Sequence, residues 1–277
     1  MKKKIALLFV AMLTMVVLAA CGSDESSTGD SGKKVLKVGM EAAYAPFNWT
    51  QSDDSNGAVP INDSKEYAAG YDVEIAKRIA DGLDMDLEIV KTDWDGLVPS
   101  LQSGAIDLVI AGMSPTDKRK ETIDFTENYY TSDYVIVVLA DGPYANAKKL
   151  EDFTGAKITG QQGTTHYDVI EQIPGVKQEV AATDFGAMRI QLQSGAIDGY
   201  VSERPEGISA EQAMKNFKYV VPEPNFKPED PASTAVAVGV KKGSDLTEKI
   251  NPILAEISEE DRQKLMEEAI ANQPAAQ

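Results

Sequence analysis

The sequence predicts an α/β protein with two similar Rossmann-like lobes that are joined by a two-segment hinge. Three observations lead to this prediction. The chain has 277 residues, more than the roughly 100 to 200 that one domain usually holds. Apolar strand patterns alternate with amphipathic helix patterns along it. One segment, LQSGAID, occurs at residues 101–107 and again, letter for letter, at 192–198.

The repeat extends backwards, so that residues 93–107 align with 184–198 and Trp94 stands opposite Phe185. Each copy reads as a short amphipathic helix that is ended by the glycine of the repeat and followed by an apolar strand. Helix-glycine-strand units are common in βαβ folds, so the repeat by itself carries no function. It indicates two similar lobes, and it marks equivalent strand ends in each.

The rest of the first lobe follows the same alternation. The sequence predicts a strand at residues 35–40, a helix at 70–83 and a strand at 85–90, because the apolar positions follow the periods of those elements. The segment 50–67 is polar and rich in turn residues, and we expect a surface loop there.

The second half begins with the apolar segment 133–140, which leads out of the first lobe. A strand is predicted at 156–159, and residues 160–172 form a glycine-bearing turn into a helix. A strand at 234–242 follows a proline-rich stretch, and two helices are predicted within 245–273. The chain therefore returns to the first lobe at its end.

This pattern predicts discontinuous lobes. Residues 34–132 and 233–277 form lobe 1, and residues 133–232 form lobe 2. The hinge is expected near residues 131–135 and 231–234, where the chain crosses between the lobes.

Residues 1–20 combine three lysines with a long uncharged apolar run, which is typical of a secretory signal peptide. The run approaches the length of a membrane span, so a retained membrane helix is the alternative. It ends in LAAC, which resembles the bacterial lipoprotein box and implies cleavage and lipidation at Cys21. Residues 21–33 would then be a flexible tether. We expect a lipid-anchored protein on the extracytoplasmic face of the cell membrane, as on a Gram-positive cell surface.

The composition limits the partners and the chemistry. Cys21 is the only cysteine, so internal disulfides are excluded. Without residues 1–20 the chain keeps 24 basic and 44 acidic residues, a balance that argues against nucleic acid as a partner. The carboxylates either solvate the surface or attract cationic ligands.

The repeat also locates a candidate site, because ligands of open α/β sheets bind at the carboxyl ends of strands. Gly112 follows the first GAID by five residues, and Glu203 follows the second by the same number. Ser114 and Arg119 come just after Gly112, and they suit a carboxylate. A guanidinium can donate two parallel hydrogen bonds to the two carboxylate oxygens. Glu203 suits an ammonium group, and the Gly112 carbonyl is a second acceptor for it.

A carboxylate subsite opposite an ammonium subsite describes an α-amino acid. At this point the chain resembles the polar amino-acid substrate-binding lipoproteins of ABC importers (bacterial extracellular solute-binding protein family 3), over residues 34–245. The matching segments are AAYAPFNW, GYDVEIAKRIA, WDGLVPSLQSGAIDLVIAGMSPTDKRKETIDFTENYY, GTT and IDGYVSE. The resemblance implies the type II periplasmic-binding-protein fold, closure of the lobes over an amino acid, and delivery to a membrane permease.

The resemblance also assigns residues. It places Gly112, Ser114 and Arg119 on the backbone of the ligand, together with Thr164 or Thr165 from lobe 2. Glu203 stands where the family more often has aspartate, which keeps the ammonium role and lengthens the side chain by one methylene. The side-chain pocket is assigned to Glu41, Tyr44, Phe47, Trp94 and Gln161, with core packing as the alternative for the aromatic residues.

An aromatic pair beside a carboxylate favours a cationic ligand side chain. We therefore expect arginine, lysine or histidine as the ligand. A neutral polar amino acid such as glutamine or cystine is the alternative, because Glu41 also suits a hydroxyl or an amide.

Other functions have weaker support in the sequence. A few proteins with this fold are cyclohexadienyl dehydratases, and His166 with Glu203 would then form an acid–base pair. Metal-ligand clusters and nucleophile motifs are missing from the sequence, so we expect neither an enzyme nor a cofactor. A receptor lobe is a third possibility, but no second apolar span follows in the sequence. A protein that closes and docks is expected to be a monomer.

Overall fold

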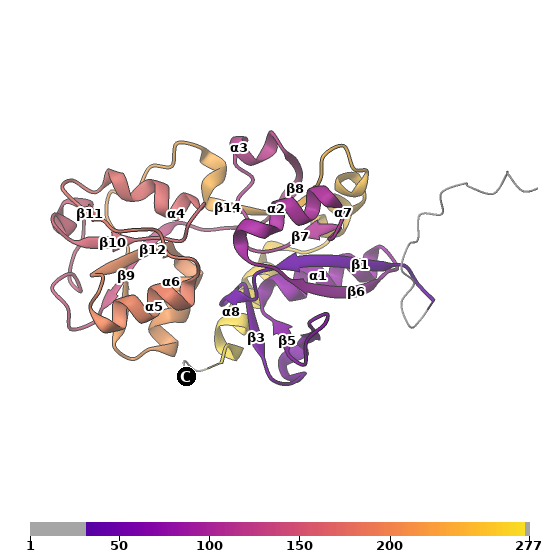
Figure 1. Cartoon of the computed structure of the whole chain (residues 1–277), viewed down its shortest axis with the longest axis horizontal. Helices are drawn as coiled ribbons and strands as arrows, with labels where there is room; N and C mark the ends of the chain where they lie inside the picture. The colour runs from indigo at the N-terminus through magenta and orange to yellow at the C-terminus, as the bar shows by residue number, and fades with distance from the viewer. Residues whose placement is uncertain (1–31, 275–277) are drawn as a thin grey trace, which may run out of the picture.

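The computed structural model describes residues 32–274 and places them in two lobes, each built on a five-stranded sheet (Figure 1). The predicted signal peptide, Cys21 and nearly all of the tether lie outside the described residues. The predicted fold class is confirmed by the two sheets and the helices packed around them.

The sheet of lobe 1 has the strand order β6-β1-β7-β14-β8. Strand β1 pairs in parallel with β6 and with β7, whereas β14 runs antiparallel to β7 and β8. The bounds are β1 Val35–Met40, β6 Asp86–Lys91, β7 Leu108–Val109, β8 Ile123–Thr131 and β14 Ala235–Lys241.

The sheet of lobe 2 repeats this plan in the order β11-β10-β12-β9-β13. Strand β10 pairs in parallel with β11 and β12, and β9 runs antiparallel to β12 and β13. The bounds are β9 Tyr134–Leu139, β10 Lys157–Thr159, β11 Lys177–Gln178, β12 Gly199–Glu203 and β13 Phe217–Val220. Each sheet therefore receives one antiparallel strand from a chain segment that arrives from the other lobe.

The two crossings lie side by side. Strand β8 ends at Thr131 and β9 begins at Tyr134, while the 3₁₀ helix η4 (Pro231–Thr234) leads into β14. The Ser132 N–H donates to the Thr234 carbonyl at 2.8 Å, so a backbone hydrogen bond ties the outgoing and returning segments together. The lobe boundaries at 132/133 and 232/233 remain predictions.

Helices cover both sheets. In lobe 1, α1 buries its apolar face through Val73, Ile75, Ala76 and Ile79, as expected for an amphipathic helix on a sheet. The helices are α1 Tyr71–Gly82, α2 Trp94–Ser103, α3 Asp117–Lys120, α4 Thr165–Asp168, α5 Phe185–Ser194, α6 Arg204–Ala213, α7 Leu246–Ala255 and α8 Glu259–Asn272. Short 3₁₀ helices lie at η1 Ser55–Gly57, η2 Leu150–Phe153 and η3 Val169–Gln172.

A four-stranded sheet beside lobe 1 was not predicted. It has the order β2-β3-β5-β4, with β2 Ala43–Tyr44, β3 Asn48–Gln51, β4 Val59–Pro60 and β5 Tyr67–Ala69. The expectation of a plain loop at 50–67 was wrong, because this segment holds β4 and the paired ends of β3 and β5. Strands of two to four residues are too short for a periodic pattern, and Pro60 suits only an edge strand.

Candidate functional site

The site lies between the lobes, where strand ends and helix starts of both repeats converge. Among the residues predicted for it, the pocket is lined by Tyr44, Trp94, Gly112, Ser114, Arg119, Gln161, Thr164 and Thr165. The free space is about 10 Å³, roughly that of one water molecule. The lobes therefore stand closed against each other, and an amino acid needs them to separate.

Gly112 follows β7 and must be glycine for two reasons. Its φ of +61° is left-handed, a conformation that residues with a Cβ atom adopt at a cost. A Cβ atom there would also lie 2.8 Å from Cε1 of Tyr44. The turn therefore brings the backbone close to an aromatic ring of the pocket.

Arg119 extends from α3 toward lobe 2. Its guanidinium donates to the Ser114 carbonyl at 2.9 Å and to the Gly163 carbonyl of lobe 2 at 3.1 Å, and it lies 5.2 Å from the ring centre of Trp94. Burial lowers the pKa of Arg119 to about 10, so the side chain keeps its charge at neutral pH. Among the described residues no carboxylate forms an ion pair with it, and the fork is available to an anion.

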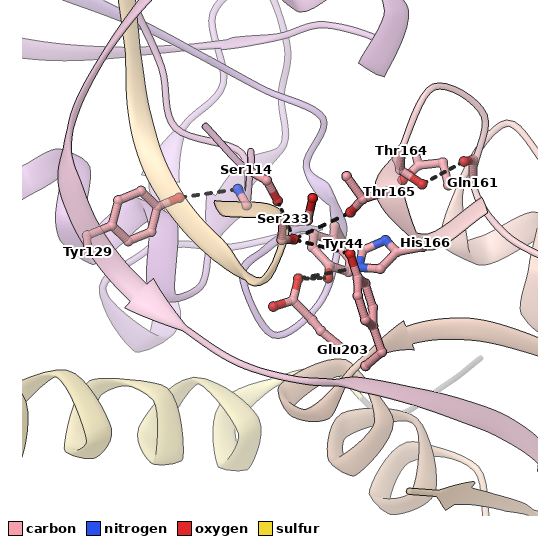
Figure 2. A network of polar contacts seen from close by, with 11 residues as sticks. Tyr44, Ser114, Tyr129, Gln161, Thr164, Thr165, His166, Glu203 and Ser233 are labelled. Carbon is pink, nitrogen blue, oxygen red and sulfur yellow. Dashed lines mark hydrogen bonds and ion pairs between the residues drawn. The ribbon is translucent and has the colours of Figure 1, made fainter. Parts of the chain in front are cut away.

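Hydroxyl groups from both lobes meet at the hinge. Ser114 donates to the Ser233 carbonyl at 3.0 Å and Thr165 donates to the same carbonyl at 3.4 Å (Figure 2). Thr164 donates instead to the Gln161 carbonyl at 2.7 Å. Ser233 was not predicted for the site, because a contact through a backbone carbonyl leaves no mark on the sequence.

Glu203 is the last residue of β12 and faces lobe 1. Its carboxylate accepts a hydrogen bond from the Tyr44 hydroxyl, and Nε2 of His166 lies 3.9 Å from its Oε1 (Figure 2). Glu203 is 7% exposed, and this burial raises its pKa to about 8. A buried carboxylate without a full cationic partner is costly, which suits a site that receives an ammonium group.

A second carboxylate lies at the lobe interface. Glu41 of lobe 1 accepts from Nε2 of Gln161 of lobe 2, at 2.9 Å to Oε1 and 3.1 Å to Oε2. Burial raises the pKa of Glu41 to about 7. Nearby, Gln162 donates to Asp95 across the lobes at 2.6 Å. The structure therefore brings Glu41 and Gln161, both predicted for the side-chain pocket, into direct contact.

The aromatic residues divide into a pocket wall and a layer behind it. Tyr44 stacks on Phe185 of lobe 2, with ring centres 4.3 Å apart. Phe47 does not line the pocket, since it is fully buried behind Tyr44 at 5.0 Å between ring centres. Phe47 was predicted for the pocket with core packing as the alternative, and the structure places it in the core.

Three pocket residues, Ala111, His166 and Phe185, were missed or assigned another role. Phe185 lines the pocket, and the repeat carried the signal, because its alignment sets Phe185 opposite Trp94. His166 also lines it, and burial lowers its pKa to about 4, so that it is neutral. Its 3.9 Å separation from Glu203 exceeds a hydrogen bond, which weakens the predicted acid–base pair.

Metal sites and membrane spans are two further features that residues 32–274 could hold. No group of three or more His, Cys, Asp and Glu side chains is placed to hold a metal ion there. None of the helices in this part of the chain has the length and apolar character that crossing a bilayer requires.

With this geometry described, comparison with known proteins identifies the family. Residues 36–271 match the model of the bacterial extracellular solute-binding proteins, family 3. The chain belongs to this family. It is therefore a solute-binding protein with the two-lobe fold of periplasmic binding proteins, and the family is one of binding proteins and not of enzymes.

Family members of known ligand are similar along nearly the whole chain. The arginine-binding extracellular protein ArtP of Bacillus subtilis is 31% identical over 266 residues, which cover 94% of each chain. The L-cystine-binding protein TcyA of the same organism is 28% identical over 275 residues, with the same coverage. A crystal structure of an amino acid ABC transporter substrate-binding protein from Streptococcus pneumoniae, bound to L-arginine, is similar with a TM-score of 0.74 and 30% identity, covering 86% of this chain and 94% of that one.

Proposed function

We propose that this solute-binding protein captures an L-amino acid between its lobes and delivers it to the permease of an ABC transporter. The observation that carries the proposal is the placement of opposite charges on the two lobes where they meet: Arg119 lines the pocket, and Glu203 lies directly behind it, in contact with the pocket residue Tyr44. Arg119 of lobe 1 donates to two backbone carbonyls but has no carboxylate partner among the described residues, and Glu203 of lobe 2 offers a buried carboxylate. A zwitterion satisfies both groups at once, the carboxylate at Arg119 and the ammonium at Glu203.

The backbone contacts follow from this pairing. Ser114, Thr164 and Thr165 carry hydroxyls that line the same pocket, and Gly112 supplies a carbonyl at the end of β7. We assign the ligand carboxylate to Arg119 with these hydroxyls. The ammonium is assigned to Glu203 and the Gly112 carbonyl.

The side chain of the ligand is proposed to be basic, with arginine first. Tyr44 and Trp94 line the pocket, and Glu41 adds a second buried carboxylate at the lobe interface. A cation near aromatic faces gains about 0.5 to 2 kcal/mol, and Glu41 would neutralise its charge. The arginine-binding relatives support this choice.

A neutral polar amino acid is the second candidate, and one contact favours it. The Gln161 amide already donates to both oxygens of Glu41, so the pair can serve an amide or a hydroxyl without a net cation. The similarity to the L-cystine-binding protein TcyA supports the same alternative.

Capture requires the lobes to open and close. The hinge segments near 131–135 and 231–234 are tied by the Ser132–Thr234 hydrogen bond, and rotation there would separate Tyr44 from Glu203 and Arg119 from Gly163. The ligand binds first to the lobe that carries Arg119, and closure brings Thr164 and Glu203 over it. No chemical reaction is needed, so we propose that the protein is not an enzyme.

The location follows from the N-terminal residues. We propose that residues 1–20 are removed, that Cys21 carries the lipid, and that the protein works as a monomer at the outer face of the membrane. Replacing Cys21 by serine should release the protein into the medium, which cell fractionation measures. Full retention on the membrane would contradict the lipid anchor.

A thermal-shift screen against the twenty amino acids tests the function. A ligand at about 100 times its Kd adds about 2.7 kcal/mol of stability, so the true ligand should raise Tm by several degrees. We expect arginine, lysine or histidine to give the largest shift. A response confined to acidic amino acids would overturn the proposed side chain, and silence with all twenty would overturn amino-acid binding.

A further inference from the structure

Gly112 is held from inside lobe 1 by a buried tyrosine. The Gly112 N–H donates to the hydroxyl of Tyr129 at 3.2 Å (Figure 2), and this hydroxyl in turn donates to Oδ1 of Asp72 at 2.8 Å. Asn48 donates to the other oxygen of Asp72 at 2.7 Å. A chain of hydrogen bonds thus runs from a buried carboxylate to the backbone of the ligand site.

The carbonyls that follow Gly112 in the chain have partners within the protein. The Met113 carbonyl accepts from Ala237 N–H at 3.0 Å, and the Ser114 carbonyl accepts from Arg119. Among the described residues no hydrogen bond to the Gly112 carbonyl is found. The Gly112 carbonyl is therefore a group that a ligand can use, whereas the N–H of the same residue already donates to Tyr129 inside lobe 1.

Packing alone does not explain this arrangement. Tyr129, Asp72 and Asn48 are all fully buried, and a phenylalanine at 129 would fill the same space without a polar partner. Burial raises the pKa of Asp72 to about 6, although the hydrogen bonds from Tyr129 and Asn48 oppose the shift. No ion pair to Asp72 is found in residues 32–274, so a carboxylate is kept in the core at a cost.

We propose that Tyr129, oriented by Asp72, is a positioning residue that fixes the Gly112 peptide so that its carbonyl meets the ammonium group of the ligand. The inference rests on the proposed function, because it assumes a ligand with an ammonium group. Tyr129 itself does not line the pocket, so its effect on binding acts through Gly112.

Tyr129→Phe tests the proposal, and Tyr71→Phe is its matched control. Tyr71 is equally buried and belongs to the same aromatic cluster, but its hydroxyl donates to the Tyr129 carbonyl at 2.9 Å and makes no contact with Gly112. Each variant loses one buried hydroxyl, so a loss of stability is expected in both. Only Tyr129→Phe frees the Gly112 N–H.

The direct measurement is the amide proton resonance of Gly112 in the purified protein. In Tyr129→Phe it should move upfield, because the N–H loses its acceptor, and in Tyr71→Phe it should stay near its original position. This measurement needs no ligand. An unmoved Gly112 resonance in Tyr129→Phe would overturn the proposal even if amino-acid binding is established.

Calorimetry with L-arginine and with 5-guanidinopentanoate, which lacks the ammonium group, gives the functional readout. Tyr129→Phe should weaken arginine binding about 5- to 50-fold, as expected when a buried polar group loses its partner, and leave the deaminated analogue within about twofold. Tyr71→Phe should leave both affinities near those of the wild type. Equal losses for both ligands, or in both variants, would show a general role in the core and overturn the positioning role.

Asp72→Asn provides a second route if Tyr129→Phe does not fold. Oδ1 of Asn48 is buried without a partner, so a flipped Asn48 amide can accept from the new amide at 72 and keep the core satisfied. The acceptor for Tyr129 becomes neutral and weaker. We expect a smaller loss of arginine affinity than in Tyr129→Phe, and the Gly112 resonance should shift in the same direction. If neither the affinity nor the resonance changed, Asp72 would not orient Tyr129.

The outcomes separate the two proposals. If the wild type binds no amino acid, the proposed function fails, and the Gly112 resonance still reports whether Tyr129 holds the peptide. If arginine binds normally to Tyr129→Phe while the resonance has moved, the hydrogen bond exists but does not position the ligand site, and the inference fails alone.

Discussion

The two copies of LQSGAID build the same scaffold in the two lobes. Helices α2 and α5 both end at a glycine with left-handed φ, +81° at Gly104 and +74° at Gly195. The carboxylate of Asp107 accepts from Lys37 N–H at 2.9 Å, and that of Asp198 accepts from Lys157 N–H at 2.8 Å. In each lobe the repeat therefore joins a helix to the central strand and ties that strand to its parallel neighbour, β1 in lobe 1 and β10 in lobe 2.

The two copies differ in the residues that follow them at the strand ends. After the first copy the chain forms the Gly112 turn and presents a backbone, hydroxyls and Arg119. After the second copy it presents Glu203 at the end of β12 and continues directly into α6. The repeated residues therefore supply geometry, whereas the residues that follow them place opposite charges, Arg119 and Glu203, on the two lobes.

The aromatic residues that open α2 and α5 differ in a similar way. Trp94 is half-buried and lies against the Arg119 guanidinium, while Phe185 is buried and stacks on Tyr44. Equivalent helix starts thus support different parts of the pocket: Trp94 lies beside the cationic Arg119, and Phe185 lies beside the aromatic Tyr44.

Arg119→Ala should weaken amino-acid binding by about 30- to 5000-fold, because the ligand carboxylate loses its partner in a desolvated site, a loss of about 2 to 5 kcal/mol. Calorimetry measures the affinity. Lys118→Ala, an exposed neighbour on α3, is the control and should bind normally. An Arg119→Ala protein that folds and keeps its affinity would contradict the carboxylate subsite.

Glu203→Gln should cost about 10- to 100-fold in affinity, since a charged hydrogen bond becomes a neutral one. The loss should be smaller than for Arg119→Ala because the Gly112 carbonyl still accepts from the ammonium. Glu211→Gln, at an exposed position of α6, is the matched control. If the loss matched that of Glu211→Gln, lobe 2 would not hold the ammonium.

The pH dependence should identify the same carboxyl group. The pKa of Glu203 is about 8 in the folded protein, above its ordinary value of 4.5, because of burial. A raised folded pKa contributes stability that is fully present below the unfolded pKa and is lost as pH rises through the folded pKa. We therefore expect the free energy of unfolding, without ligand, to fall between about pH 4.5 and 8.

Ligand affinity should change in the opposite direction. The ammonium binds the ionised carboxylate, so affinity should rise between pH 6 and 8 by up to about tenfold per pH unit. Glu203→Gln should reduce the pH dependence of both the free energy of unfolding and the ligand affinity. The pH dependence that remains would come from groups such as Glu41, whose pKa is about 7. Calorimetry and denaturant unfolding across this range measure the effect, and a Glu203→Gln profile identical to that of the wild type would refute it.

Trp94→Leu and Phe185→Leu test the aromatic pair. Trp94→Leu removes the face that lies against Arg119, so we expect a loss of about 2- to 30-fold in affinity with little change in stability. Phe185→Leu should reduce stability as well, because Phe185 is 2% exposed and stacks on Tyr44. Thermal unfolding measures the loss of stability and calorimetry measures the loss of affinity. If both variants lost affinity and stability to the same extent, Trp94 and Phe185 would not differ in role.

Gly104→Ala and Gly195→Ala should have the smallest effects and equal ones. At both positions a Cβ atom would meet open space, so the cost is that of left-handed φ alone, about 1 to 2 kcal/mol each. Chemical unfolding measures the loss, and ligand affinity should not change. Clearly unequal losses would show that the two copies are not equivalent as scaffolds.

Much of the fold was predictable from local pattern. The strand at 35–40 and the helices at α1, α7 and α8 follow from apolar periodicity, which records how each element is buried. The strands of the small sheet were missed because two to four residues show no period. Strand β8 (Ile123–Thr131) was missed because its chain pattern mixes polar and apolar residues without alternation.

The candidate site divides in the same way. Gly112, Arg119 and Glu203 were found from their distance to a repeat, because a repeated scaffold places residues at equal offsets in equivalent positions. Phe47 and Tyr44 are three residues apart and equally aromatic, and no pattern told which one faces the cleft. The structure answers this, since Phe47 packs behind Tyr44.

Local sequence thus carries the elements, the two-lobe plan and the charges at the strand ends, since each depends on neighbours along the chain. Contacts between the lobes depend on how the two sheets meet across the hinge. The pairings of Tyr44 with Glu203 and of Glu41 with Gln161 are therefore visible in three dimensions alone. The support of Gly112 by Tyr129 lies within lobe 1, and it too depends on the folded sheet, which brings β8 beside the Gly112 turn. These contacts join residues 17 to 159 positions apart, a separation at which no local pattern constrains the partner.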